Sequence, residues 1–435
     1  MFLSVLATGY RLSYAGHKDL RCVARPQTII DSSWTMDPNT TLAVVPSLTA
    51  RAVPNGGVVL TKKFINGMRK YVEYWDGPVA AFMEPAHVPT SNLDEIEINP
   101  AKLPFTLKIV RFDDPNFGQL LAKHRLVLGS VSHRQNHLEA LCRSSGLPCV
   151  YVAEFSLKTR LQVIRSEVTN PVISLRRQFW DFNQERRQRR AIRLSSGIQC
   201  NGTPTFEAYR LINPSPLLFF DTRVSEDMLV ADSELTERAK ALTQGSPLRL
   251  MFSGRLIAMK GADELVLVAA ELRRLGVSFD MMICGGGVLE PKIRADIERH
   301  GLSECIKLTG ILEFEKELVP LTKKWTDLFV CCHRTGDPSG TYLDVMGCGV
   351  PIVGYDNEAF RGMIRESSAG WLVPMNQPKQ VAEKIAELNK DRAMLLDASK
   401  RAIEFARLHT FERTFKARIE HMKSCSAPTK PRPVA

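Results

Sequence analysis

Residues 337–357 read DPSGTYLDVMGCGVPIVGYDN, and we take this stretch as the one that decides the fold. The apolar run at 328–332 before it is typical of a buried parallel strand. Ser339, Gly340 and Thr341 then predict a helix start, where unpaired backbone N–H groups and the helix dipole favour an anion. A second apolar strand follows the helix. The pattern suits a nucleotide diphosphate, and Asp344, one turn into the helix, is positioned to reach a ribose.

Residues 344–351, DVMGCGVP, resemble the donor-site signature of the retaining glycosyltransferases of family 4, which have the GT-B fold. In that family two glutamates stand eight positions apart, and the second precedes a small residue and Gly-x-Pro. Here the second acid is Asp344, the position eight before it is Gly336, and the nearest acid, Asp337, comes one position later. The resemblance implies that Asp344 holds the donor ribose, and it places Asp337 beside the donor.

Two cations follow the first predicted strand of the second half of the chain. Gly254 and Arg255 end the strand at 248–253, and Lys260 opens the next helix. An arginine can fork two phosphate oxygens while a lysine acts as a point charge, so the pair can hold a diphosphate. The motif is similar to the Gly-Arg…Lys-Gly pair of family 4, whose cations bind the donor pyrophosphate. A solvated loop arginine and a helix-start lysine are the alternative reading.

Three further loops resemble donor-contacting segments of the same family. Gly285 and Gly286 follow the strand at 278–284 and allow a ligand to approach the backbone, although a plain strand-to-helix turn fits equally. Leu312 ends a segment similar to the one whose backbone meets the nucleobase. Gly56 and Gly57 resemble the glycine pair that faces donor phosphate and acceptor, and the alternative is a loop that needs a positive φ.

Glu154 directly follows the predicted strand at 149–153, where many family members carry a histidine near the reacting sugar. A carboxylate at the carboxyl end of a strand can orient an acceptor hydroxyl or take its proton. A helix N-terminal acid is an equally good interpretation. His133 and His137 lie at i and i+4, but zinc needs further ligands that the sequence does not supply, so we interpret both as surface or packing residues.

Charge is the remaining strong signal, because the chain has a net charge of +11 and seven arginines between 175 and 193 with aromatic residues among them. Such a helix can lie on an anionic bilayer. A solvated helix face is the second reading, and nucleic acid is the least favoured partner. The residues expected at the membrane surface are Arg176, Arg177, Trp180, Arg186, Arg187, Arg189 and Arg190.

Strands alternate with helices in both halves, which predicts an α/β protein with two doubly wound Rossmann-like domains facing across a cleft. Helices are expected at 58–75, 133–144 and 260–275, among others. We divide the chain into an N-terminal extension (1–40) that includes an alternative start at Met36, an acceptor-binding domain (41–240) and a donor-binding domain (241–408). Residues 409–435 are expected to form a helix that crosses back, as in the resembled fold, and a disordered tail from Ser424.

Bulk properties exclude several classes. No apolar run reaches the ~20 residues of a membrane span, and the ten cysteines lack the spacing of a zinc site, so a cytoplasmic protein is expected, with an option of peripheral attachment to the inner face of the plasma membrane. A Rossmann G-x-G-x-x-G and a Walker lysine are both missing from the sequence. Hydride transfer and nucleotide hydrolysis therefore lack their motifs.

The resemblance implies a retaining, metal-independent glycosyltransferase without a cofactor. It would move a sugar from a nucleotide-diphosphate donor to a hydroxyl of a sugar or lipid-linked acceptor, in polysaccharide or glycolipid synthesis. Arg255 and Lys260, with the amides of Gly340 and Thr341, would stabilise the leaving diphosphate. The alternatives are a GT-B sugar-nucleotide epimerase, and a non-catalytic protein that binds a nucleotide sugar or a membrane surface.

Overall fold

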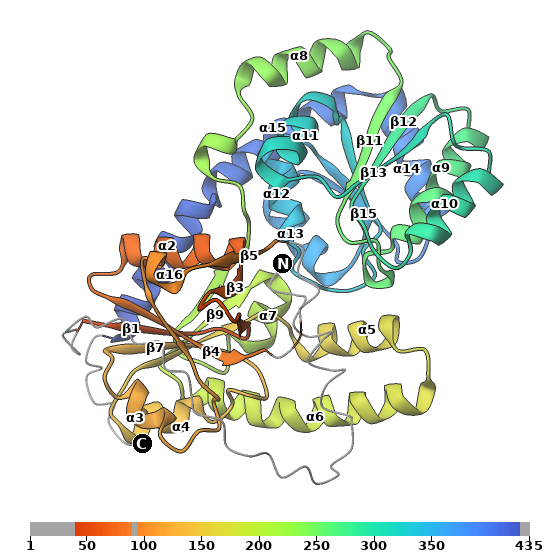
Figure 1. The fold of residues 1–435 in the computed structure, drawn as a ribbon. Coiled ribbons are helices and arrows are strands. Elements are labelled where there is room, and N and C mark those ends of the chain that lie inside the picture. The colour runs from red at the N-terminus through yellow and green to blue at the C-terminus, as the bar shows by residue number, and fades with distance from the viewer. Residues whose placement is uncertain (1–39, 87, 89–93, 427–435) are drawn as a thin grey trace.

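The computed structural model describes residues 40–86, 88 and 94–426, which form two parallel sheets covered by helices (Figure 1). The proposed extension at 1–39 and the alternative start at Met36 lie outside the described residues. Within the described ranges no helix is both long and apolar enough to cross a bilayer. The expected α/β class with two Rossmann-like sheets is confirmed.

The first sheet has seven parallel strands in the order β10-β9-β8-β7-β1-β4-β6. It also has a small extension, in which β2 pairs parallel with β4 and the further pairs β2–β3 and β3–β5 are antiparallel. The parallel strands are β1 (Leu42–Val45), β4 (Val79–Pro85), β6 (Thr106–Ile109), β7 (Leu126–Ser130), β8 (Cys149–Ala153), β9 (Gly197–Asn201) and β10 (Pro216–Phe219). The extension consists of β2 (Thr49–Ala52), β3 (Val58–Thr61) and β5 (Glu95–Ile98). The connecting helices are α2 (Lys62–Tyr74), α3 (Phe117–Leu121), α4 (Leu138–Ser144), α5 (Leu157–Glu167), α6 (Pro171–Leu194) and α7 (Gly202–Tyr209).

The second sheet is entirely parallel, with the order β13-β12-β11-β14-β15-β16. Its strands are β11 (Leu248–Ser253), β12 (Phe279–Cys284), β13 (Ile306–Gly310), β14 (Leu328–Cys331), β15 (Ile352–Tyr355) and β16 (Gly370–Val373). Its helices are α9 (Leu265–Arg274), α10 (Glu290–Arg299), α11 (Val319–Trp325), α12 (Thr341–Gly347), α13 (Glu358–Ser367), α14 (Pro378–Lys390) and α15 (Ala393–Leu408), and α8 (Asp232–Thr243) precedes them.

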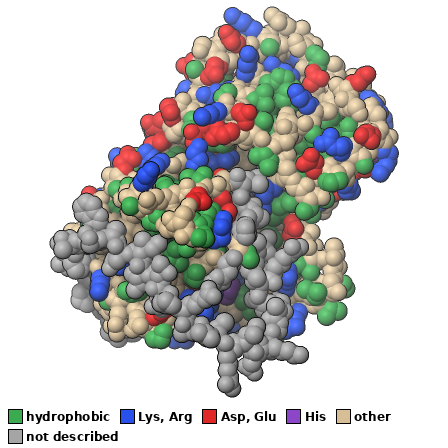
Figure 2. All heavy atoms as spheres, in the orientation of Figure 1, with side chains coloured by type: hydrophobic (Ala, Val, Ile, Leu, Met, Phe, Trp, Pro, Cys, Tyr) green, Lys and Arg blue, Asp and Glu red, His purple; other side chains and the backbone are tan. Residues whose placement is uncertain are grey.

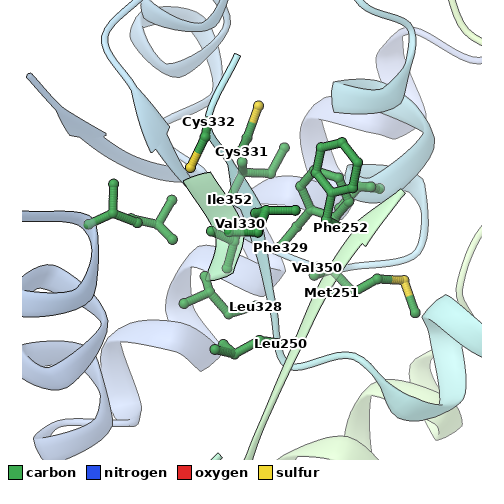
Figure 3. Close-up of a cluster of buried hydrophobic side chains, with 14 of the residues drawn as sticks. Leu250, Met251, Phe252, Leu328, Phe329, Val330, Cys331, Cys332, Val350 and Ile352 are labelled. Carbon is green, nitrogen blue, oxygen red and sulfur yellow. The ribbon is translucent and has the colours of Figure 1, made fainter. Parts of the chain in front are cut away.

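The core of the second sheet is built from the apolar runs that the sequence marks as buried strands. Figure 3 shows side chains of β11 and β14 meeting at the centre, where Phe252 and Phe329 stack with ring centroids 6.1 Å apart. Leu250, Val330 and Ile352 are fully buried around them. Strand β11 has β12 on one side and β14 on the other. The chain therefore changes direction at β11, and ligands of doubly wound sheets bind at the carboxyl ends of strands at such a point.

Three predicted helices begin later than expected. Residues 58–61 form β3 instead of the start of a helix, because Val58 and Val59 pair with β2 and β5; the Thr61 hydroxyl then accepts from the Phe64 amide (3.2 Å) and caps α2. Residues 133–137 are turns before α4. At 258–264 two short 3₁₀ turns replace the first helical turns, because Gly261 is left-handed (φ 59°) and breaks the helix.

The last helix, α16 (Phe411–Ser426), crosses back to the first domain and packs beside α2 (Figure 1). The Phe415 ring lies 5.2 Å from the Tyr71 ring, and Arg418 donates from Nε to Gln199 (2.9 Å). Where the chain returns, the Phe411 amide donates to the carbonyl of Val224 (2.9 Å) in the outgoing segment. The tail expected to be disordered from Ser424 is helical through Ser426, because α16 continues that far; residues 427–435 lie outside the described residues.

Strands β1–β10 fall within 41–240 and β11–β16 within 241–408. The division of the chain at those positions, and the assignment of acceptor and donor to the two parts, stay predictions.

Helix α6 is fixed to the first domain by a buried polar cluster. Arg160 of α5 donates from Nε to Asp181 (2.9 Å) and from Nη2 to Glu185 (2.7 Å), both on α6. The Tyr209 hydroxyl also donates to Glu185 (3.2 Å). All four side chains are buried. Arg160 is the buried cation that the two carboxylates share, and Glu185 has a second, more exposed partner in Arg189 (3.5 Å).

Replacing Arg160 with methionine should destabilise the fold by about 3–5 kcal/mol, because two buried carboxylates lose their cation. Urea unfolding followed by circular dichroism measures this change. The control is Arg294→Met, which breaks an ion pair with Glu290 between side chains that are 60% and 36% exposed and should cost less than about 1 kcal/mol. Equal losses in the two variants would show that the cluster does not hold α6.

Candidate functional site

A cleft of about 910 Å³ opens between the two domains, at the carboxyl ends of β11 and β12 and at the start of α12. From the first domain its wall is one face of α2, with Lys62, Lys63, Asn66, Arg69 and Lys70 at helical spacing. From the second domain the lining includes most of the residues that the sequence singled out: Gly254, Arg255, Lys260, Gly285, Leu312, Ser339, Gly340, Thr341 and Asp344. Residues from four separate loops therefore meet in one place.

Lys260 is a buried cation in the floor of the cleft. Its ammonium pairs with the Asp337 carboxylate and donates to the Ser339 hydroxyl (3.1 Å). Gly261 makes this position possible, because an added Cβ would lie 1.9 Å from the Cys332 carbonyl oxygen, and the turn brings the backbone onto β14. Asp337 is fully buried, and its Oδ1 has no hydrogen-bond partner among the described residues. Asp337 thus contacts Lys260 and is absent from the residues that line the cleft, and its contact with the donor stays a prediction.

Arg255 is the second cation of the predicted pair. It follows Gly254 directly after β11, lines the cleft and makes no ion pair with a described residue. The two glycine loops beside it are in close contact, since a Cβ on Gly285 would lie 1.9 Å from the Gly254 carbonyl oxygen. Such a contact requires glycine at 285, whose φ is 139°. The guanidinium is thus available to an anion in the cleft.

The start of α12 supplies backbone donors. The amides of Gly340 and Thr341 have no acceptor among the described residues, and both residues line the cleft. Free amides at a helix start stabilise negative charge. Two cations and two amides therefore converge on a space that suits a diphosphate.

Asp344 is engaged by the crossover segment between the domains. Its Oδ1 accepts from the Thr222 hydroxyl (3.0 Å) and the Arg223 amide (2.9 Å), and its Oδ2 accepts from Arg223 Nη2 (3.1 Å). The Arg223 guanidinium in turn lies 3.6 Å from the centre of the Phe314 ring. The contact of Asp344 with a ribose stays a prediction. A ribose hydroxyl that bound there would share the Asp344 carboxylate with Arg223.

Arg223 and Phe314 are the main residues of the cleft that the sequence reading did not assign. Arg223 is 121 positions from Asp344, and no periodic pattern links two such residues. The only signal in the sequence was their position, since both follow directly after a predicted apolar element.

Some predicted residues lie elsewhere. Gly56 and Gly57 form the turn of the β2–β3 hairpin outside the cleft lining, where the Gly57 amide donates to the Asn55 side chain (3.0 Å). Their resemblance to a phosphate-facing glycine pair did not anticipate this hairpin. Gly286 packs against Ile311 and is also absent from the lining. The basic residues of α6 are likewise remote from this cleft.

Glu154 lies in a smaller cavity of about 40 Å³ that shares Lys63 with the main cleft. It accepts from Asn201 Nδ2 (2.7 Å), while Lys63 pairs with Asp221. Burial, and then the neighbouring Asp221 carboxylate, raise the pKa of Glu154 above its ordinary value. The predicted role at an acceptor hydroxyl is not tested by this position, because Glu154 does not line the cleft that holds Arg255.

The two histidines pack within the fold. The His133 ring lies 5.1 Å from the Trp180 ring, and His137 Nε2 lies 2.9 Å from the Phe112 carbonyl oxygen. In the part of the chain that the structure describes, no group of three or more His, Cys, Asp or Glu side chains could hold a metal ion.

The raised pKa of Glu154 predicts a pH-dependent contribution to stability. The folded chain keeps a proton on Glu154 that the unfolded chain releases above about pH 4.3, so stability is lost as the pH rises through the folded pKa. The free energy of unfolding of Glu154→Gln, measured with urea, should therefore increase relative to that of the wild type as the pH rises from 4 to 7. The exposed Glu404→Gln serves as the control, and a pH-independent difference for Glu154→Gln would contradict the raised pKa.

Comparisons with known proteins agree with this geometry. Residues 233–408 match the family model "Glycosyl transferases group 1". WcaL of Salmonella typhimurium, named as a colanic acid biosynthesis glycosyltransferase, is 27% identical over 152 residues, which are 34% of this chain and 37% of that protein. A GDP-mannose-dependent alpha-(1-6)-phosphatidylinositol monomannoside mannosyltransferase of Mycobacterium tuberculosis is 26% identical over 156 residues, 34% of this chain and 40% of that one. The alignments thus span well under half of these relatives' length.

The whole chain can be compared with solved structures. Anabaena Alr3699/HepE in complex with UDP superposes with a TM-score of 0.62 at 14% identity, over 88% of this chain and 99% of that one. An identity this low is evidence for the fold alone. The chain therefore has the GT-B fold, and its second domain is similar to the group 1 glycosyltransferases.

Proposed function

We propose that the chain transfers a sugar from a nucleotide-diphosphate donor to a hydroxyl group of a sugar or lipid-linked acceptor. The observation that carries this proposal is the convergence of Arg255, Lys260 and the amides of Gly340 and Thr341 on one cleft. The convergence lies within 233–408, the part that matches the group 1 glycosyltransferases. The activity belongs to glycan assembly, as the names of the relatives suggest.

The donor groups are suited to leaving-group stabilisation. Negative charge builds on the diphosphate as the bond to the sugar breaks, and preorganised cations and amides stabilise that charge. Arg255 is available for this role. Lys260 would contact the diphosphate either in addition to Asp337 or in place of it. We propose that these groups replace a metal and that no cofactor takes part.

The reaction is proposed to retain the anomeric configuration, because the acceptor hydroxyl would attack the sugar on the same face from which the diphosphate leaves. In such a front-face displacement the new bond to the acceptor oxygen replaces the bond to the diphosphate, and no protein nucleophile is needed. The acceptor would enter from the α2 side, which faces the donor groups across the cleft. Glu154 is kept as the group that orients or deprotonates the acceptor hydroxyl; to do so it must act through the space shared at Lys63.

One observation favours a second candidate, a nucleotide-sugar binding protein without turnover. Gly336 occupies the position of the first family glutamate, and a Cβ there would lie 2.7 Å from Glu358 Oε2. The Gly336 amide also donates to Gln162 of the first domain (2.7 Å). An interdomain contact thus lies where the first glutamate of the family pattern would be. A protein that only binds a nucleotide sugar does not need that glutamate.

Arg255→Ala should remove at least half of the stabilisation by the matching nucleoside diphosphate. A ligand at ~100 times its Kd adds about 2.7 kcal/mol to the stability of the folded state, and loss of a charge-assisted phosphate contact removes about 1.5–3 kcal/mol of binding. A thermal-shift panel of UDP, GDP, ADP and their sugars on both proteins measures this effect. Lys307→Ala, an exposed position in the same domain, is the control.

Two outcomes separate the candidates. Formation of glycosylated product or release of free sugar from the stabilising donor supports transfer, whereas stabilisation without any turnover supports the binding role. If no nucleotide shifts the folded wild type, both candidates fail.

A further inference from the structure

Helix α6 is oriented opposite to an ordinary surface helix, because it buries its polar side. The side chains turned into the protein are mainly polar: Ser174, Asp181, Gln184, Glu185 and Gln188. The side chains turned outward at the same spacing include Val172, Leu175, Phe179 and Phe182. An amphipathic surface helix normally buries its apolar stripe. The direction of α6 therefore requires an explanation.

The outward apolar side chains are well exposed. Val172 is 72% exposed, Leu175 69%, Phe179 70% and Phe182 51%. Phe179 and Phe182 are the only exposed phenylalanines in the described part of the chain. Figure 2 is drawn in the orientation of Figure 1, and hydrophobic side chains reach the surface at its lower right, where Figure 1 places the start of α6. An apolar cluster of this size on a surface marks a binding site more often than chance exposure.

The same stripe continues as a row of arginines. Arg186, Arg190 and Arg193 follow Phe182 at steps of three or four residues, so they lie on the same outward face. These three and Arg187 are exposed, and none has a carboxylate partner among the described residues. The outward face is thus mainly apolar over its first half, where Arg176 is the exposed charge, and cationic over its second half.

The orientation of the face is enforced. Arg160 holds Asp181 and Glu185, and the Asn136 amide donates to Gln184 (3.3 Å), all on the inward side. Rotation of α6 that buried the phenylalanines would expose this cluster and break its ion pairs. In Figure 1, α5 separates α6 from the second domain, so the face does not close onto the cleft.

We propose that the outward face of α6 docks on an anionic phospholipid bilayer. The apolar half would enter the interfacial region, and the arginines would pair with lipid phosphates, which match their unpaired charge. A nucleic acid would engage the arginines but leave the phenylalanines and Val172 in water. This proposal goes beyond sugar transfer and does not depend on it.

Vesicle flotation tests the docking. The wild type should float with vesicles of phosphatidylcholine and phosphatidylglycerol, and not with phosphatidylcholine alone. Phe179→Ser/Phe182→Ser, and separately Arg186→Gln/Arg187→Gln/Arg190→Gln/Arg193→Gln, should each weaken partitioning by about tenfold or more, since each basic residue near an anionic surface contributes severalfold. Both variants change exposed side chains, so their melting temperatures should match the wild type.

Matched controls separate the face from bulk charge and bulk hydrophobicity. Leu211→Ser/Val288→Ser removes two apolar side chains that are 85% and 82% exposed elsewhere, and Lys307→Gln/Lys324→Gln/Lys379→Gln/Lys400→Gln removes four charges from the second domain. Both controls should float like the wild type. The proposal is overturned if the wild type does not float, if controls and α6 variants lose binding equally, or if α6 binds RNA or an acidic protein while vesicles are ignored.

Discussion

The pairing of β11 with β14 is the constraint on which the site depends. Parallel strands end at the same edge of a sheet, so the segments after β11 and β14 lie together although Lys260 and Asp337 are 77 positions apart. Gly261 lets the first of these segments touch the backbone of Cys332. The unbonded amides at the start of α12, the paired lysine and the arginine without an ion pair among the described residues all follow from that one adjacency.

Contacts between the domains frame the cleft on its α5 side. Gln162 of α5 bonds both the Gly336 amide and Glu358, and Thr203 of α7 donates to the Glu358 carbonyl (3.3 Å). A Cβ at 336 would lie 2.7 Å from Glu358 Oε2, so the Glu358 side chain would have to move from its contact with Gln162. The departure of this chain from the two-glutamate pattern therefore coincides with a close interdomain contact, and the two features are best understood together.

The sequence predicted the α/β class and most strands of both sheets, because a parallel strand buried on both faces is a continuous apolar run. It also grouped Arg255, Lys260 and residues 339–341, since strand ends in such sheets converge. It missed the β2–β3–β5 extension, because the apolar residues of the short strand β3 (58–61) directly precede α2 and continue its helical apolar spacing. It also missed the Arg223–Asp344 pair and the inward polar side of α6. Neither a long-range ion pair nor the choice of which helix face is buried produces a periodic pattern in the sequence.

The hydrogen bond between Phe411 and Val224 joins the two segments that connect the domains. Two connecting segments that are bonded to each other restrict the relative movement of the domains more than two independent connections would. Arg223 is the neighbour of Val224 and is held by Asp344 inside the cleft. A ligand that took the place of Arg223 on Asp344 would therefore change a contact one residue away from the point where the two connections between the domains are joined.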